Sequence, residues 1–327
     1  MEPLYCGRVD LMGKVPWRNE YVRPSAPTPM LTGFDKWLGD SVETATRGAA
    51  RWGDAYAAAT LHAFVFAPAK KTGSVSGAME ILAGVVAPSE DGAGRQYPVS
   101  LLGTIALPSA VTSTPEVLPL LVEDFWQSAS DLLTVTRAAG PSAFEQSIGA
   151  LQTRFEFTVD GARGAYGQWT AALMVSELTV LLFGVEPSRS PEKTMQDVVE
   201  ALRPFRAIEN PRTPLTLKLP LGSAAGAAVC FWVDFVRRAA RWRGTLPSFF
   251  WSHDGNSGTM LLHLGDPPQS TLAELWGPKR DRDEVFDLTQ TSVSPAAEVA
   301  VAPAPEPRFL SNPSEPVSEF LARVAVL

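Results

Sequence analysis

Residues 80–107 read EILAGVVAPSEDGAGRQYPVSLLGTIAL, and the architecture of the chain follows from the pattern in this stretch. Residues 80–86 and 97–107 are apolar runs of the length that is typical of buried strands. Between them lies an acidic loop rich in glycine, in which Asp91 can form an ion pair with Arg95. The stretch therefore predicts two buried strands that are joined by an ordered loop.

Patterns on either side of this stretch indicate further strands and a set of helices. Alternating apolar runs predict strands at residues 4–9, 61–66 and 215–219. Residues 248–264 contain two further runs around a turn-rich cluster, which predicts a hairpin. Apolar residues at helical spacing predict helices at residues 35–38, 42–59, 114–132, 141–157, 169–183, 194–202, 224–242 and 271–276. These elements predict an α/β fold in the loose, α+β sense: a mixed, mainly antiparallel sheet flanked by helices, with a second, smaller α+β unit.

Two local details can be predicted more sharply. Thr114 is expected to cap a helix with its hydroxyl, because Pro115 follows at the first helical position. His253 and His263 flank the predicted hairpin and are expected to face one another across it, while His62 is expected to be a satisfied, half-buried side chain. None of the three histidines is therefore expected to carry chemistry.

The length of 327 residues suggests about two domains. The predicted divisions are an N-terminal α/β domain, connecting helices, a C-terminal α+β domain, an Ala/Pro-rich linker and a terminal amphipathic helix, at residues 1–110, 111–149, 150–290, 291–308 and 309–327. The terminal helix can dock on its own chain or lie in the groove of a partner, and the sequence leaves both open.

The composition excludes several classes of function. A net charge of −7 and a pI near 5.2 argue against nucleic acid and anionic membranes as partners. No apolar run reaches the roughly 18 residues of a membrane helix, and the N-terminus does not resemble a signal peptide. With only two cysteines, the chain is expected to be cytoplasmic.

The sequence also lacks the motifs of common enzymes. No phosphate-binding loop, dinucleotide fingerprint or nucleophile elbow is present. Three histidines and two cysteines cannot form a zinc site at a recognised spacing, although a magnesium site built from carboxylates alone stays open. We therefore expect no catalytic residue, no metal and no cofactor.

Two clusters have the composition of protein interfaces. Residues 13–23 (GKVPWRNEYVR) and residues 87–98 (APSEDGAGRQYP) concentrate arginine, aromatic and charged side chains. Tryptophan, tyrosine and arginine are enriched at binding hot spots. The predicted partner-binding residues are Lys14, Pro16, Trp17, Arg18, Glu20, Tyr21, Arg23, Ser89, Asp91, Arg95 and Tyr97. The alternative is that both clusters serve only to maintain the fold.

The same two clusters resemble the TagF family of type VI secretion-associated proteins. The first is similar to the family's opening motif at Gly13, Lys14, Val15, Pro16, Val22 and Arg23, and departs from it at Asn19, Glu20 and Tyr21. The second, at residues 84–99, is similar to a family block and departs from it only at Val99. With shorter similarities between them, the resemblance spans about residues 5–107 in the expected order.

The resemblance implies a non-catalytic, post-translational repressor of type VI secretion. Its implied partner is Fha, a forkhead-associated-domain scaffold that it binds or sequesters, and the family is associated with threonine kinase and phosphatase pathway components. Two alternatives remain at this point. One is a hydrolase or phosphate-handling enzyme that uses Glu20, Asp91 and Arg95, and the other is a structural accessory component of the secretion apparatus.

Overall fold

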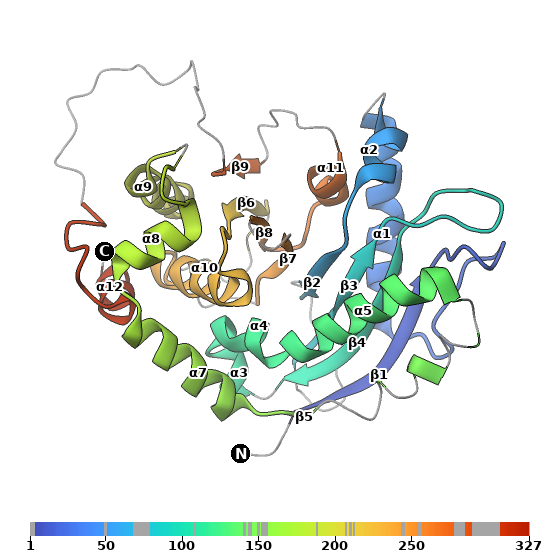
Figure 1. The fold of residues 1–327 in the computed structure, drawn as a ribbon, viewed down its shortest axis with the longest axis horizontal. Helices are drawn as coiled ribbons and strands as arrows, with labels where there is room; N and C mark the ends of the chain where they lie inside the picture. Colours follow the sequence, from blue (N-terminus) through green and yellow to red (C-terminus); the bar gives the residue numbers. More distant parts are fainter. Residues whose placement is uncertain are drawn as a thin grey trace.

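The computed structural model gives the arrangement of most of the chain (Figure 1). The residues it describes are 4–48, 51–67, 79–107, 109–139, 142, 146–148, 151, 156–187, 189–206, 208, 211, 213–242, 246–253, 257–277, 285–289 and 308–326. Most of the predicted linker at 291–308 therefore lies outside the described residues. Within the described ranges, no helix has the length and hydropathy needed to cross a bilayer.

Nine strands form one sheet in the order β5-β1-β4-β3-β2-β7-β8-β6-β9. They are β1 (Leu4–Gly13), β2 (His62–Phe66), β3 (Met79–Ala87), β4 (Val99–Leu107), β5 (Glu156–Phe157), β6 (Leu215–Pro220), β7 (Ser248–His253), β8 (Gly258–Leu264) and β9 (Val285–Asp287). Neighbouring strands are antiparallel except β6 and β9, which run parallel. The predicted α+β fold with a mixed, mainly antiparallel sheet is confirmed.

Helices cover both faces of this sheet. They are α1 (Pro29–Gly48), α2 (Trp52–Ala58), α3 (Ser109–Thr112), η1 (Pro115–Val117), α4 (Leu118–Leu121), α5 (Glu123–Ala139), α7 (Val159–Ala172), α8 (Val175–Phe183), α9 (Pro191–Leu202), η2 (Arg203–Phe205), α10 (Ala225–Ala239), α11 (Thr271–Trp276) and α12 (Val317–Val324), where η denotes a 3₁₀ turn. Figure 1 shows α1 and α2 behind the sheet and α5 in front of it.

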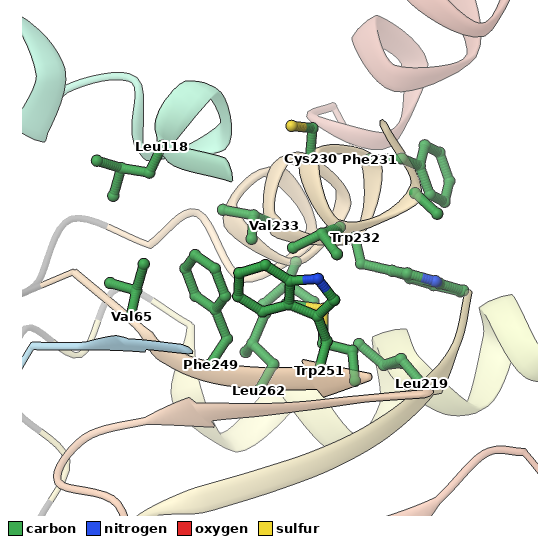
Figure 2. Packing of buried hydrophobic residues seen from close by; sticks show 14 of the residues in the cluster. Val65, Leu118, Leu219, Cys230, Phe231, Trp232, Val233, Phe249, Trp251 and Leu262 are labelled. Carbon is green, nitrogen blue, oxygen red and sulfur yellow. The ribbon is translucent and has the colours of Figure 1, made fainter. Parts of the chain in front are cut away.

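The sheet separates two hydrophobic cores because its strands alternate. In β2, Val65 faces a core that is covered by α4, α5, α10 and α12. The neighbouring residues Phe64 and Phe66 face a second core, which is covered by α1, α2 and α11. Figure 2 shows Val65 and Phe249 on the strands of the first core, beneath Leu118 and Val233 of the helices.

The sheet is continuous between the two halves of the chain. Strands β2 and β7 pair through Phe64 and Phe250, although β2 belongs to the predicted N-terminal domain and β7 to the C-terminal one. The two predicted units therefore contribute strands to one sheet, and the domain limits themselves stay a prediction.

Four predicted helices differ from the structure, and the first of them, at 42–59, is divided between the end of α1 and α2. The run at 114–132 divides into η1, α4 and α5, and Pro119 lacks the backbone N–H that one continuous helix would need at that position. The Thr114 hydroxyl makes no cap; it accepts a hydrogen bond from Arg163 at 2.9 Å.

The helices predicted at 141–157 and 169–183 also differ from the structure, the first because of strand pairing and the second because of contacts with the C-terminal segment. Most of the helix predicted at 141–157 lies outside the described residues, and its last two residues form β5 against β1. The helix predicted at 169–183 breaks at Leu173 and Met174. There the Leu173 carbonyl accepts from the Val317 N–H at 2.9 Å, so the backbone of the C-terminal segment replaces helical hydrogen bonds.

The predictions for the histidines are also corrected. In the β7–β8 hairpin, His253 pairs with Gly258 and His263 with Ser248, so the two histidines lie at opposite ends of the ladder. The short connection fixes this register. His62 is buried rather than half-buried, and its Nδ1 lies 3.0 Å from the indole nitrogen of Trp276, which donates to it.

The terminal helix docks on its own chain, which is one of the two predicted alternatives. Its apolar residues Val317, Phe320, Leu321 and Val324 are at most 1% exposed. The segment that precedes the helix is held by the carboxylate of Glu192, which accepts hydrogen bonds from two consecutive backbone N–H groups, those of Phe309 and Leu310.

Candidate protein-binding surface

The two clusters singled out in the sequence lie side by side in the structure. We call residues 13–23 and 87–98 the paired loops. Strands β1 and β4 place them together, because Gly13 is the register partner of Val99. Gly13 also exchanges two backbone hydrogen bonds with Val22, at 3.0 and 2.8 Å, which close the first loop on itself.

Gly13 can only be glycine in this arrangement. Its φ of +118° lies in the region that favours glycine, and an added Cβ would lie 2.0 Å from the carbonyl oxygen of Pro98. The close approach of the two loops therefore depends on the missing side chain at this position.

Asp91 is the centre of the paired loops. Its side chain is buried, and its Oδ1 accepts hydrogen bonds from the backbone N–H groups of Ala93 at 3.0 Å and Arg95 at 2.9 Å. Its Oδ2 lies 2.7 Å from Nε of Arg95 and 3.0 Å from Nζ of Lys14. The ion pair with Arg95 was predicted from the sequence, whereas the one with Lys14 was not.

The charge of Asp91 is strongly stabilised. Burial acts to raise the pKa of this carboxyl group, but the donors from Arg95 and Lys14 outweigh burial and hold the pKa well below its usual range. Asp91 is therefore ionised at any physiological pH and unsuited to proton transfer.

Further hydrogen bonds cross between the paired loops. The Gly92 N–H donates to the Arg18 carbonyl at 2.9 Å, and Nη2 of Arg95 donates to the Asn19 carbonyl at 2.6 Å. A Cβ on Gly92 would lie 2.7 Å from the side-chain oxygen of Asn19, so the loops touch without a gap.

Aromatic side chains join the paired loops to α1. The rings of Tyr21 and Tyr97 meet edge to face, with 5.3 Å between their centroids. The Tyr21 hydroxyl donates to Asp35 of α1 at 2.5 Å. Burial first, and the Asp35 charge second, raise the pKa of Tyr97 to about 12, and they raise the pKa of Tyr21 too, so both phenols stay protonated.

The predicted site residues divide into a buried frame and an exposed face. Ser89 and Asp91 are buried and hold the loops from within, and Ser89 exchanges hydrogen bonds with the hydroxyl of Tyr56. The half-buried residues are Lys14, Trp17, Tyr21 and Tyr97. The exposed residues are Pro16, Arg18, Glu20, Arg23 and Arg95. The exposed face is therefore rich in arginine and rests on a rigid frame.

The residues of the enzyme alternative do not assemble into an acid–base pair. Glu20 is exposed and makes no described contact with Asp91 or Arg95. The oxygens of Asp91 are already occupied by the donors named above. Among the residues that the structure describes, no group of three or more His, Cys, Asp or Glu side chains is placed to hold a metal ion.

Part of the chain, which includes both paired loops, is similar to a known protein family. Residues 10–151 match the family described as the TagF N-terminal domain, type VI secretion system-associated. No curated protein matches the sequence. A solved structure, the crystal structure of PA0076 from Pseudomonas aeruginosa PAO1, is similar with 18% identity and a TM-score of 0.46, over 84% of this chain and 96% of that chain. Both paired loops lie inside the matched range, so this chain carries a TagF N-terminal domain over residues 10–151, which links it to type VI secretion systems.

Proposed function

We propose that this chain is a non-catalytic cytoplasmic regulator that represses type VI secretion after translation. In this proposal it binds or sequesters a forkhead-associated-domain scaffold of the Fha type, and the exposed face of the paired loops is the contact surface. The observation that carries the proposal is the joining of two distant segments by Asp91 into one rigid surface.

A preorganised surface suits a binding function. The hydrogen bonds of the frame already hold both loops in place. Little conformational entropy of the loops would therefore be lost when a partner binds. The side chains of Arg18 and Glu20 make no described hydrogen bond or ion pair, and the Arg23 guanidinium lies over the Tyr21 ring at 5.6 Å. Arginine and tyrosine side chains that are held in this way match the composition of binding hot spots.

The binding test uses purified chain and purified Fha-type scaffold. The double variant Arg18→Glu, Arg23→Glu changes two exposed side chains without touching the Asp91 frame. Trp17→Ala is less suitable because Trp17 also packs against the first core. The matched control is Arg308→Glu, an exposed arginine in the C-terminal segment.

We expect the double variant to weaken scaffold binding at least about tenfold, as measured by calorimetry, with thermal unfolding unchanged. The control variant should bind like the wild type. Equal affinity of the double variant and the control would remove the paired loops as the contact surface.

A second measurement tests the mode of action. If the chain acts by sequestration, repression follows mass action and scales with the ratio of regulator to scaffold. Repeated modification of scaffold by trace amounts of chain would favour the enzyme alternative. Recovery of the chain at a fixed ratio in assembled secretion particles would favour a structural component instead.

A further inference from the structure

A cavity of about 210 Å³ opens where η1, α7, α10 and α12 meet, away from the paired loops. Figure 1 shows α7, α10 and α12 as neighbours at the opposite side of the molecule from α1. The charged side chains that line the cavity are Glu116, Arg163, Asp234 and Arg238. We call this space the helix-junction cavity.

The carboxylates of the cavity are already held by arginine. Asp234 is 1% exposed and accepts from Nη2 of Arg237 at 3.0 Å, from Nε of Arg238 at 2.6 Å and from the Tyr166 hydroxyl at 3.2 Å. Arg237 also donates to Oε1 of Glu116 at 3.2 Å. A ligand at this point therefore meets carboxylates whose charge is compensated.

Donors remain at the cavity wall after this pairing. Arg238 engages Asp234 through Nε alone, and its two terminal nitrogens have no acceptor in the described part of the chain. Its side chain is 29% exposed, so these nitrogens are accessible. The half-buried hydroxyl of Ser318, on α12, likewise has no described hydrogen bond.

We infer that the helix-junction cavity binds a small ligand through a carboxylate or phosphate group, which Arg238 and Ser318 hold. A guanidinium group offers two parallel N–H donors that match the spacing of carboxylate and phosphate oxygens. Arg163 and Arg238 balance the charges of Glu116 and Asp234 in the lining, so the cavity carries no excess negative charge that would repel an anion.

The inference links the ligand to the end of the chain and goes beyond the proposed function. Helix α12 supplies Ser318 and Leu321 to the wall, so the site is complete only when the C-terminal segment is docked. A bound anion therefore stabilises the docked segment by mass action.

The test measures thermal unfolding of the full chain with inorganic phosphate or malonate as the probe. Each probe is titrated against sodium chloride at equal ionic strength, which removes general salt effects. We expect a saturable rise in Tm with at least one probe and none with chloride. A response to phosphate alone or to malonate alone identifies which oxyanion the cavity accepts.

Two glycines on α7 provide a matched pair of variants. Gly167 lines the cavity and Gly164 does not, and a Cβ on either residue meets no atom within 4 Å. Gly167→Leu is expected to fill the cavity and weaken probe binding at least tenfold, whereas Gly164→Leu should bind like the wild type. Arg238→Gln should also weaken binding.

Two results would overturn the inference. One is the absence of saturable binding by the wild type with both probes. The other is equal probe binding by Gly167→Leu and Gly164→Leu, which would show that the bound anion lies elsewhere.

Discussion

The paired loops and the helix-junction cavity both gather arginine around buried carboxylates, but they satisfy those carboxylates differently. Asp91 receives two backbone N–H groups and two cationic side chains. Glu116 depends on Arg237, and its Oε2 has no hydrogen bond of good geometry although Nε of Arg237 lies 3.1 Å away. The pKa of Asp91 is held low, whereas burial, with the nearby Asp234 charge second, raises the pKa of Glu116. Burial acts on both carboxyl groups, and the number of donors decides whether the pKa is lowered, as for Asp91, or raised, as for Glu116.

One glycine in each region shows how closely the neighbouring atoms approach. Gly13 in the paired loops has no room for a Cβ, while Gly167 at the cavity faces open space. The loops are thus in close contact at Gly13, which suits the large partner that we propose for them. The helix junction keeps free volume and free donors, which a small ligand can use.

The largest expected loss of stability tests the close approach of the two loops at Gly13. Gly13→Ala places a methyl group against the Pro98 carbonyl at a φ that disfavours alanine, so unfolding free energy should fall by at least about 3 kcal/mol. The control is Gly94→Ala in the same loops, where φ is +76° but no atom lies within 4 Å, and the loss should be about 1 kcal/mol. Urea unfolding measures both. Similar losses would mean that conformation, not close approach, fixes the loops.

His263 is a buried titratable group with fewer hydrogen-bond partners than Asp91. His263 has one described hydrogen bond, to Thr216, and burial lowers its pKa to about 3 from 6.5. The unfolded chain therefore binds the proton first, and stability is lost as the pH falls from 6.5 towards 3. This one residue contributes about 1.4 kcal/mol per pH unit in that window.

His263→Gln removes this titration while it keeps a polar side chain for Thr216. We expect its stability to fall less steeply than that of the wild type, with a difference of about 3 kcal/mol accumulated between pH 6 and pH 4. His62, whose pKa burial lowers to about 4, titrates equally in both proteins. Urea unfolding at several pH values gives the slopes, and parallel curves would contradict the assignment.

The carboxylates themselves provide the next test. Asp91→Asn leaves Lys14 and Arg95 without a counter-charge and should lower the Tm by about 5 °C. Glu116→Gln replaces a group that burial already disfavours as an anion, so its effect should stay below about 2 °C. For Asp91, whose pKa is lowered, the gap to the wild type is full above about pH 4 and narrows below it. Calorimetry at pH 7 and pH 3 checks the order and the trend.

The sequence predicts the parts of this comparison that depend on neighbouring residues. Strands β3 and β4 follow from apolar runs, and the pair Asp91–Arg95 follows from a spacing of four residues in a turn. The contact of Lys14 with Asp91 could not be predicted, because it depends on the pairing of β1 with β4. Strand order is a long-range property that local patterns do not contain.

The helix-junction cavity was missed for the same reason. Its lining comes from four elements that lie up to about 200 residues apart in the chain, and no local pattern joins Glu116 to Ser318. The break between α7 and α8 has a related origin, since it depends on backbone hydrogen bonds from the C-terminal segment. Apolar periodicity detects which face of a helix is buried, but it does not detect a competing backbone.

The smallest expected change in stability tests whether the space next to Gly167 is empty. Gly167→Ala adds a methyl group in a helix where no atom lies within 4 Å, so the gain in helix propensity should raise stability by about 0.5–1 kcal/mol. Gly164→Ala on the same helix should give the same gain. Because an alanine is small, probe binding at the cavity should persist in both variants. A loss of stability specific to Gly167→Ala would mean that the space is occupied by protein atoms, and the contrast with Gly13 would then fail.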